Sequence, residues 1–151
     1  MFHRFAFESA FYPSLSRVPV HVRMKLDLTG IKISLKEWLA FSFQERNVLC
    51  HLPADAEDER QVFISYVDYL SAAHCGRPAA KTAPLPSSVW NTLDPVPQPV
   101  VQKSSTTGRP VGSEEWMRWK SFQRYALYKT ALSKNDPEAF LAVLNELRES
   151  G

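Results

Sequence analysis

The chain carries one short pattern in both of its halves, and this repetition constrains the fold more than any other feature. Glu37-Trp38 is followed by Arg46 and Leu49, and Glu115-Trp116 is followed by Arg124 and Leu127 at the same spacings. At about 100° per residue, a helix would place the Leu about 20° and the Arg about 80° from the Trp, so Trp and Leu share an apolar face. The pattern predicts two similar helical units that bring Trp38 and Trp116 into a common core.

Apolar residues also fall at matching places inside the two copies, whereas the flanks are unequal. The matching pairs are Leu39 with Met117, Phe41 with Trp119 and Val48 with Ala126, and Ser34 and Ser113 lie just upstream of the copies. Two copies do not suggest a solenoid, which needs at least about three stacked units. At the border of each apolar face, Arg46 and Arg124 either belong to a solvated face or pair with buried carbonyl or carboxylate groups at the junction between the repeats, which would make them structural.

Composition indicates one folded domain without a charge signature for a particular partner. The chain has 151 residues, enough for a single domain with a core, and we expect residues 1–151 to form that one domain. Hydrophobic residues make up 44% and aromatic residues 12%, so general disorder is not expected. The formal net charge is +2, without the basic run that would coat nucleic acid.

Cysteine usage and hydropathy favour a cytoplasmic protein. Cys50 and Cys75 are the chain's two cysteines, fewer than a disulfide scaffold would carry, which favours a reducing compartment. His3, Arg4 and Glu8 interrupt the first apolar residues, and no stretch reaches the roughly 18 apolar residues of a membrane span. We therefore expect neither secretion nor membrane insertion.

Residues 18–28 give two conflicting signals. Apolar residues alternate with polar ones from Val18 to Leu28, which is the period of a half-buried strand. Pro19 suits the first turn of a helix, however, and Gly30 followed by Ile31 suits a helix end. These end signals favour a helix from about Pro19 to Thr29, with a strand as the alternative.

The next helices have clear start and stop signals. Ser34 and Ser42 each stand three residues before a Glu, the capping-box spacing, which predicts a helix from Leu35 and a break at Ser42 before a second short helix. The acidic cluster at residues 55–59 predicts another helix start, and Gly76 its end. The buried face of that helix is predicted to carry Val62, Tyr66, Tyr69, Leu70 and Ala73.

The composition changes in residues 76–113, which hold seven of the chain's eleven prolines: Pro78, Pro84, Pro86, Pro95, Pro97, Pro99 and Pro110. This density predicts an irregular arm draped over the domain, with a mobile tip around Ser104 to Gly108. The expected anchors of the arm are Val89, Trp90, Leu93, Val96, Val100 and Val101.

Two further helices are expected after the arm. The first runs from Glu114 to about Leu132, and the second from Pro137 to about Arg148 with Asp136 as its cap. The predicted fold is mainly α: one helical domain of about five to six helices with a long proline-rich irregular arm.

Two Cys-His pairs give the sharpest chemical possibility in the chain. Cys50-His51 and His74-Cys75 would supply the two Cys and two His of a structural zinc site. Adjacent side chains on one backbone diverge, however, and zinc ligands usually stand two to four residues apart. The sequence therefore favours ordinary half-buried side chains, and we expect no metal and no other cofactor. A cryptic Cys-His enzyme would require one of these cysteines to be reactive.

Other chemical signatures are weak. The chain lacks a Gly-x-Ser-x-Gly nucleophile turn and both common glycine-rich nucleotide motifs, so we expect no enzyme activity. The helix pair around Ser42 has the length of a helix-turn-helix, but one Arg beside one Glu makes a poor groove-reading face. A small nucleic-acid-binding regulator remains the alternative function.

A cluster of polar residues in the first half is a candidate partner surface. Arg23, Lys25, Asp27 and Lys32 stand close together beside an apolar frame. On a strand, His21, Arg23, Lys25 and Asp27 would share one face, whereas a helix would spread them around its axis. A plain solvated face is the simpler interpretation of such a set.

Several blocks of the chain resemble the small family of nitrate reductase-associated proteins. The most specific block is Val18–Leu35 with Trp38 and Glu45-Arg46, and the other blocks that look like the family are Phe5–Phe11, Glu115-Trp116, Gln123–Lys129 and Phe140–Leu147. The resemblance implies a small cytoplasmic bacterial protein that assists the maturation or activity of assimilatory nitrate reductase, and it implies no catalytic residues.

These observations lead to one functional expectation. The chain should act as a non-catalytic accessory factor that binds nitrate reductase or its assembly machinery, through Arg23, Lys25, Asp27 and Lys32. The structural repeat, with Trp38, Arg46, Leu49, Trp116, Arg124 and Leu127, should hold the fold together.

Overall fold

The computed structural model describes residues 2–150 and is mainly helical. Its contacts divide the chain into two compact units, one of residues 2–4 and 8–86 and the other of residues 5–7 and 87–150. Each unit contains one copy of the repeated pattern. Within residues 2–150 there are nine α-helices rather than five to six, because short helices form where one long helix or an irregular arm was expected.

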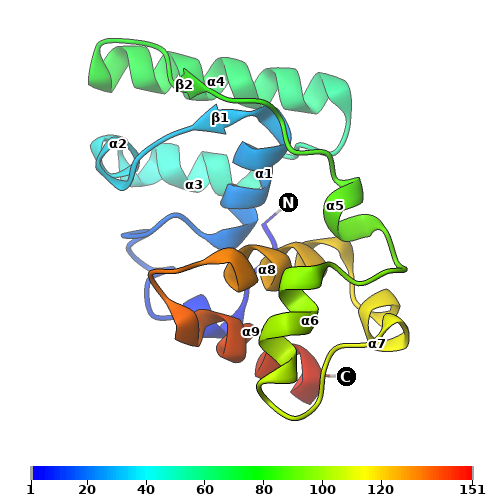
Figure 1. Cartoon of the computed structure of the whole chain (residues 1–151). Coiled ribbons are helices and arrows are strands. Elements are labelled where there is room, and N and C mark those ends of the chain that lie inside the picture. Colours follow the sequence, from blue (N-terminus) through cyan, green and yellow to red (C-terminus); the bar gives the residue numbers. More distant parts are fainter. Residues whose placement is uncertain (1, 151) are drawn as a thin grey trace. The chain divides into compact units, whose positions relative to one another are not determined.

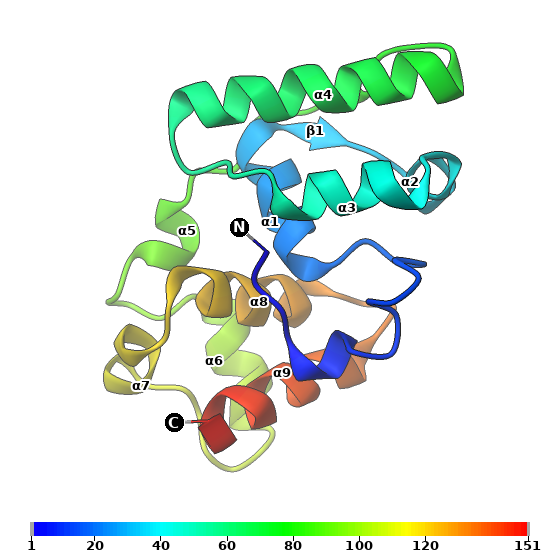
Figure 2. The same ribbon diagram turned by 180° about the vertical axis from the view of Figure 1, so that it is seen from behind.

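The first unit consists of four helices and a two-stranded ribbon (Figure 1). The elements are α1 (Val20–Thr29), β1 (Ile31–Lys32), α2 (Leu35–Ala40), α3 (Phe43–His51), α4 (Glu57–Cys75) and β2 (Ala80–Lys81). The 3-10 helix η1 (Ala6–Glu8) lies upstream of them, with its first two residues in the second unit and Glu8 in the first. β1 and β2 are antiparallel, with Ile31 opposite Lys81. Helix α4 contacts α1, α2 and α3, and Figure 2 shows it running along one side of this unit.

The second unit is built around one central helix. Its elements are α5 (Ser88–Asn91), α6 (Gln98–Ser105), α7 (Ser113–Arg118), α8 (Ser121–Leu132) and α9 (Pro137–Ser150). Helix α8 contacts α5, α6 and α9. Residues 5–7 complete the unit, since the Phe5 ring lies 5.7 Å from the Phe122 ring and the N–H groups of Ala6 and Phe7 donate to Glu146.

Residues 20–29 form a helix, as the end signals predicted, and not a strand. Gly30 caps α1 in the left-handed conformation at φ 72°, and its N–H donates to the Leu26 carbonyl. The alternation of apolar and polar residues misleads because most of α1 is buried, polar residues included. Ile31, which follows the cap, is buried as the helix-end pattern requires.

Local capping signals correctly predicted the starts of α2 and α3 and the end of α4. The Ser34 hydroxyl accepts from the Glu37 N–H and the Ser42 hydroxyl from the Glu45 N–H, both at 3.1 Å, and each Glu side chain accepts a hydrogen bond in return. Gly76 ends α4 at φ 81°. The predicted break at Ser42 and the predicted end at Gly76 are both confirmed.

The buried face of α4 differs from the prediction. Phe63, Val67 and Leu70 are buried, whereas Val62 and Tyr69 are exposed. The helix has two neighbouring apolar stripes, and helical periodicity alone does not distinguish the one that packs against α1 and α2. Of the predicted stripe, Leu70 is buried and Tyr66 is half-buried.

The irregular arm expected over residues 76–113 is partly helical. Pro97 and Pro99 stand at the start of α6, where the first turn tolerates proline. Ser104, predicted to begin a mobile tip, is fully buried: its hydroxyl donates to the Val100 carbonyl and accepts from the Val111 N–H. The anchors Trp90, Val96 and Val100 are buried as expected, whereas Leu93 is exposed.

The two copies of the repeat fold alike. The helix expected from Glu114 to Leu132 is interrupted at Trp119-Lys120, which matches the break at Phe41-Ser42 in the first copy. The Lys120 N–H donates to the Gln123 side chain, so the second helix begins without a capping hydroxyl. That missing hydroxyl is why capping signals identified the first break and not the second.

Each repeat uses its tryptophan to hold an upstream segment. The indole N–H of Trp38 donates to the Leu15 carbonyl at 2.8 Å, and that of Trp116 donates to the Thr92 carbonyl at 3.0 Å. Both side chains have no exposed surface. Trp38 belongs to the hydrophobic core of the first unit, and Trp116 lies in the second unit.

The repeated arginines bind carbonyl groups, and each does so within its own unit rather than at a junction between the repeats. Arg46 donates to the carbonyls of Phe41 and Ser14, at 3.0 and 3.3 Å. Arg124 donates to the carbonyls of Trp119 and Trp90 and to the Asn91 side chain. In both copies the guanidinium joins the end of the first short helix to the segment that the tryptophan holds, while Leu49 and Leu127 are fully buried.

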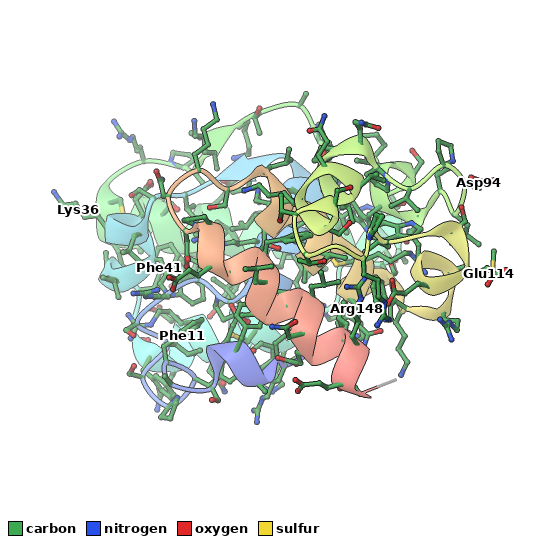
Figure 3. The ribbon with its side chains drawn as sticks, turned by 60° about the horizontal axis from the view of Figure 1, so that its bottom comes forward. Phe11, Lys36, Phe41, Asp94, Glu114 and Arg148 are labelled. Carbon is green, nitrogen blue, oxygen red and sulfur yellow. The ribbon has the colours of Figure 1, made fainter. Side chains whose placement is uncertain are left out.

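The glutamate of the pattern serves the two copies differently. Glu37 caps its own helix through the Ser34 N–H, whereas Glu115 accepts two hydrogen bonds from Arg148 at 2.8 and 2.9 Å. The adjacent Glu114 is exposed, and its side chain points away from α7 (Figure 3). Glu115 therefore ties α7 to the end of α9.

Two glycine substitutions should separate crowding from backbone strain. A Cβ on Gly30 would lie 2.4 Å from the Thr82 carbonyl oxygen, whereas one on Gly76 would meet nothing within 4 Å. Both have positive φ, so Gly76→Ala should lower the free energy of unfolding by about 1 kcal/mol and Gly30→Ala by about 1–3 kcal/mol more. Urea denaturation of both variants measures the difference, and equal losses would contradict it.

The role of Arg124 can be tested with a conservative change. Arg124→Lys should lower the free energy of unfolding by about 1–3 kcal/mol, because one ammonium cannot replace a fork that serves three acceptors. The matched control is Arg118→Lys at an exposed site, which should stay within about 0.5 kcal/mol of wild type. Thermal and urea unfolding check both values; a neutral Arg124→Lys would show that the clamp is dispensable.

Candidate functional site

The four residues of the predicted partner surface lie in different environments. Arg23 and Lys32 are exposed and Asp27 is partly exposed. Lys25 has 2% of its surface exposed, so the folded chain does not offer it to a partner. The prediction that Lys25 belongs to the surface is wrong because a helix, unlike a strand, turns alternate residues to different sides.

Lys25 instead closes the end of another helix. Its ammonium donates to the carbonyls of Leu49 and Cys50, at 3.1 and 2.7 Å, in the last turn of α3. Carbonyls there have no partner within their own helix, and a cation is favoured at that end. Burial lowers the pKa of Lys25 to about 8, while the acidic groups of Cys50 and Asp55 act in the opposite direction.

His21 lies on the same helix and is also buried. Its Nδ1 accepts a hydrogen bond from the His3 N–H at 3.0 Å, so this nitrogen carries no proton in the folded chain. Burial lowers the pKa of His21 to about 3, and the charges of Lys25 and His3 add to the effect. His21 therefore stays neutral and fixes the amino-terminal segment to α1.

Glu8 completes this buried polar cluster, which comprises Glu8, His21 and Lys25. Its carboxylate accepts from the Val20 N–H at 2.9 Å and from the Tyr12 hydroxyl at 2.8 Å. Pro19, at the cap position of α1, supplies no side-chain hydrogen bond, so Glu8 acts as a distant cap. Sequence reasoning missed Glu8 because a cap twelve residues upstream leaves no spacing signal.

The buried polar cluster joins segments rather than exposing a reactive group. Each of its three side chains has a hydrogen bond to backbone from another part of the first unit. The neighbouring Cys50 is fully buried, and burial raises the pKa of its thiol to about 12. A thiol of this kind is protonated at neutral pH, whereas nucleophilic and metal-binding cysteines act as thiolates.

The two Cys-His pairs do not form one site. The Nδ1 of His51 lies 2.8 Å from the Asn47 carbonyl, and the Nε2 of His74 lies 2.9 Å from the Glu45 carboxylate. Across residues 2–150, no group of three or more His, Cys, Asp and Glu side chains could hold a metal ion. The tetrahedral zinc arrangement considered from the sequence is therefore not assembled.

A set of exposed basic and apolar residues on β1, α2 and the start of α3 was not predicted. Leu35, Leu39 and Phe43 are each about half exposed, at 50%, 47% and 45%. Leu35 and Leu39 are one helical turn apart, and Lys36 on the same short helix points away from it (Figure 3). We define these four residues, together with the exposed Lys32 just upstream, as the α2 patch.

The α2 patch has the composition of a docking surface. Exposed apolar side chains that lie together mark interaction sites more often than isolated ones do. Lys32 and Lys36 add positive charge beside these apolar side chains. The sequence signal that could have found the patch is the four-residue spacing of Leu35, Leu39 and Phe43, apolar residues to which no buried role was assigned.

Within residues 2–150, no helix is both long enough and apolar enough to span a membrane.

The buried His21 should make the fold sensitive to acid. As pH falls from 6.5 toward 3, unfolded chains protonate this histidine and folded ones do not, so its contribution to the free energy of unfolding falls by up to about 1.4 kcal/mol per pH unit. His21→Asn keeps an acceptor but removes the titration, and should flatten the pH dependence by about that slope between about pH 6 and pH 4.

Urea denaturation at several pH values measures the slope. The matched control is His51→Asn at an exposed histidine. A wild-type slope in His21→Asn, or an equal flattening in both variants, would refute the assignment of acid sensitivity to the buried ring.

Comparison with known proteins supplies the family. No curated protein matches the chain, and no solved structure does. The family described as conserved nitrate reductase-associated protein matches residues 4–147, which cover both units, both repeats and the α1–α2 block. The chain therefore belongs to the nitrate reductase-associated protein family.

Proposed function

We propose that this protein is a non-catalytic accessory or maturation factor of assimilatory nitrate reductase in the bacterial cytoplasm. The family match over residues 4–147 carries the proposal. The partner is the reductase or a component of its assembly machinery, and the action is binding. No resident metal or cofactor is part of the proposal.

The distribution of polar groups supports binding over turnover. Glu8, His21 and Lys25 are committed to hydrogen bonds that join the amino-terminal segment, α1 and α3. Charged side chains on the surface of the same block, Arg23 and Lys32, are exposed. With Lys36 and the exposed apolar side chains of the α2 patch, they give residues 23–43 both positive charge and apolar surface, a composition that suits a partner segment that is acidic and amphipathic.

The nucleic-acid alternative has no specific support. Helices α2 and α3 form a pair of the expected length, but Arg46 donates to carbonyls of Phe41 and Ser14. The exposed residues of α3 are Phe43, Gln44, Asn47, Val48 and His51. A second helix without a free Lys or Arg is poorly suited to the phosphate contacts on which groove binding depends.

A charge-reversal experiment tests the proposed binding face. Arg23→Glu with Lys32→Glu should reduce the nitrate reductase recovered with the tagged protein from nitrate-grown cells by about tenfold or more, because both changes oppose an acidic partner. The matched control is Arg118→Glu with Lys134→Glu, which makes the same change of charge at exposed residues of the second unit.

Circular dichroism and thermal unfolding establish that both variants fold. Undiminished recovery of the reductase with the Arg23 and Lys32 variant would refute this face. Failure of wild-type protein to recover the reductase or any protein of its assembly would refute the proposed function itself.

A further inference from the structure

The exposed side of α4 carries a regular seam of residues that are uncharged except for Asp58 at its start. Val62 and Tyr69 are 57% and 66% exposed, although both are large and partly apolar. The exposed residues Asp58, Val62, Ser65, Tyr69, Ala72 and Gly76 follow one another at spacings of four and three. We call these six residues the α4 seam.

The spacing of the α4 seam is that of a helix-pairing surface. Alternating steps of four and three residues place successive side chains along one narrow stripe, which is the a/d pattern of paired helices. Residues 57–75 form a helix of 19 residues, about 28 Å long. Between Asp58 at one end and Arg77 just past the other, the stripe contains no charge.

The α4 seam is complementary to itself when reversed. In an antiparallel pair centred at the level of residue 67, Val62 of one helix faces Ala72 of the other, and Ser65 faces Tyr69. Each large side chain thus meets a small one, which lets the two helices approach closely. The same register sets the Asp58 end of one helix beside the Gly76 end of the other, where Arg77 follows the helix cap, so opposite charges lie near each other at both ends.

The end charges have no competing ion pair. Asp58 and Arg77 are exposed, and neither forms a salt bridge within residues 2–150. Other charged groups near the seam are already paired: Glu57 with Arg60, and Asp68 with Lys81. Antiparallel pairing also sets the positive end of each helix dipole beside the negative end of the other.

We propose that the protein forms a twofold homodimer in which α4 packs antiparallel against α4 of a second copy of this chain. The contact is isologous, as a twofold axis requires. One helix pair falls below the roughly 1,200 Å² of standard stable interfaces, so the dimer is weak, with a dissociation constant of about 10–100 µM. The proposal is independent of the proposed function, because it concerns α4 and not residues 23–43.

Sedimentation velocity on the full chain tests the dimer. Wild-type protein should shift from monomer to dimer as its concentration rises from about 1 to about 500 µM. Tyr69→Glu places two like charges within the seam and should leave the protein monomeric throughout this range. The control, Leu141→Glu, changes an exposed apolar residue of α9 and should dimerise as wild type does.

A charge swap tests the antiparallel register. Asp58→Arg and Arg77→Asp, made singly, should each weaken the dimer about tenfold, because each sets like charges opposite at both ends. The double variant restores opposite pairs and should recover wild-type association. This rescue does not depend on the folding of the Tyr69 variant.

The outcomes that would overturn the proposal are distinct from those of the partner experiment. A wild-type chain that remains monomeric at every concentration overturns the dimer, as does wild-type association in Tyr69→Glu. A swap without rescue overturns the register. Recovery of another protein on α4, with loss of that protein in Tyr69→Glu and no dimer, would assign the seam to a different occupant.

Discussion

Satisfying backbone carbonyls between helices is the constraint on which both units depend. In each unit a tryptophan indole and an arginine guanidinium donate to carbonyls of a segment more than twenty residues upstream. A carbonyl buried without a donor costs about 1–3 kcal/mol, so these side chains decide which segment lies against the helix pair. The Trp and Arg of the pattern make equivalent hydrogen bonds in the two halves. The Glu does not, because Glu37 caps its own helix and Glu115 binds Arg148.

The first unit adds a second polar system inside its core. Glu8, His21 and Lys25 each bind backbone groups from a different segment, and the pKa values of His21 and Lys25 are lowered chiefly by burial. A perturbed pKa often marks a reactive site, but structural networks perturb pKa values as well. Here Glu8 binds the start of α1, Lys25 binds the end of α3 and His21 binds the backbone N–H of His3. These hydrogen bonds offset the cost of burying the three side chains, and they fix the amino-terminal segment.

Because the buried polar groups form hydrogen bonds within the fold, the exposed surfaces are the parts of the molecule that can meet a partner. Residues 23–43 combine exposed positive charge with the apolar side chains of the α2 patch, while the α4 seam is uncharged between oppositely charged ends. Two surfaces with such different chemistry suit different occupants, an acidic partner for one and a second copy for the other.

The sequence by itself determined the features that depend on neighbouring residues. Caps at Ser34 and Ser42, the glycine ends at Gly30 and Gly76 and the family identity could all be read locally. Only the tertiary structure decided that Lys25 is buried, that Glu8 caps α1, that each Trp supports a separate unit and that Val62 and Tyr69 face outward. These outcomes depend on residues far apart in the chain, because a helical pattern fixes which side chains share a face but not which face finds a partner.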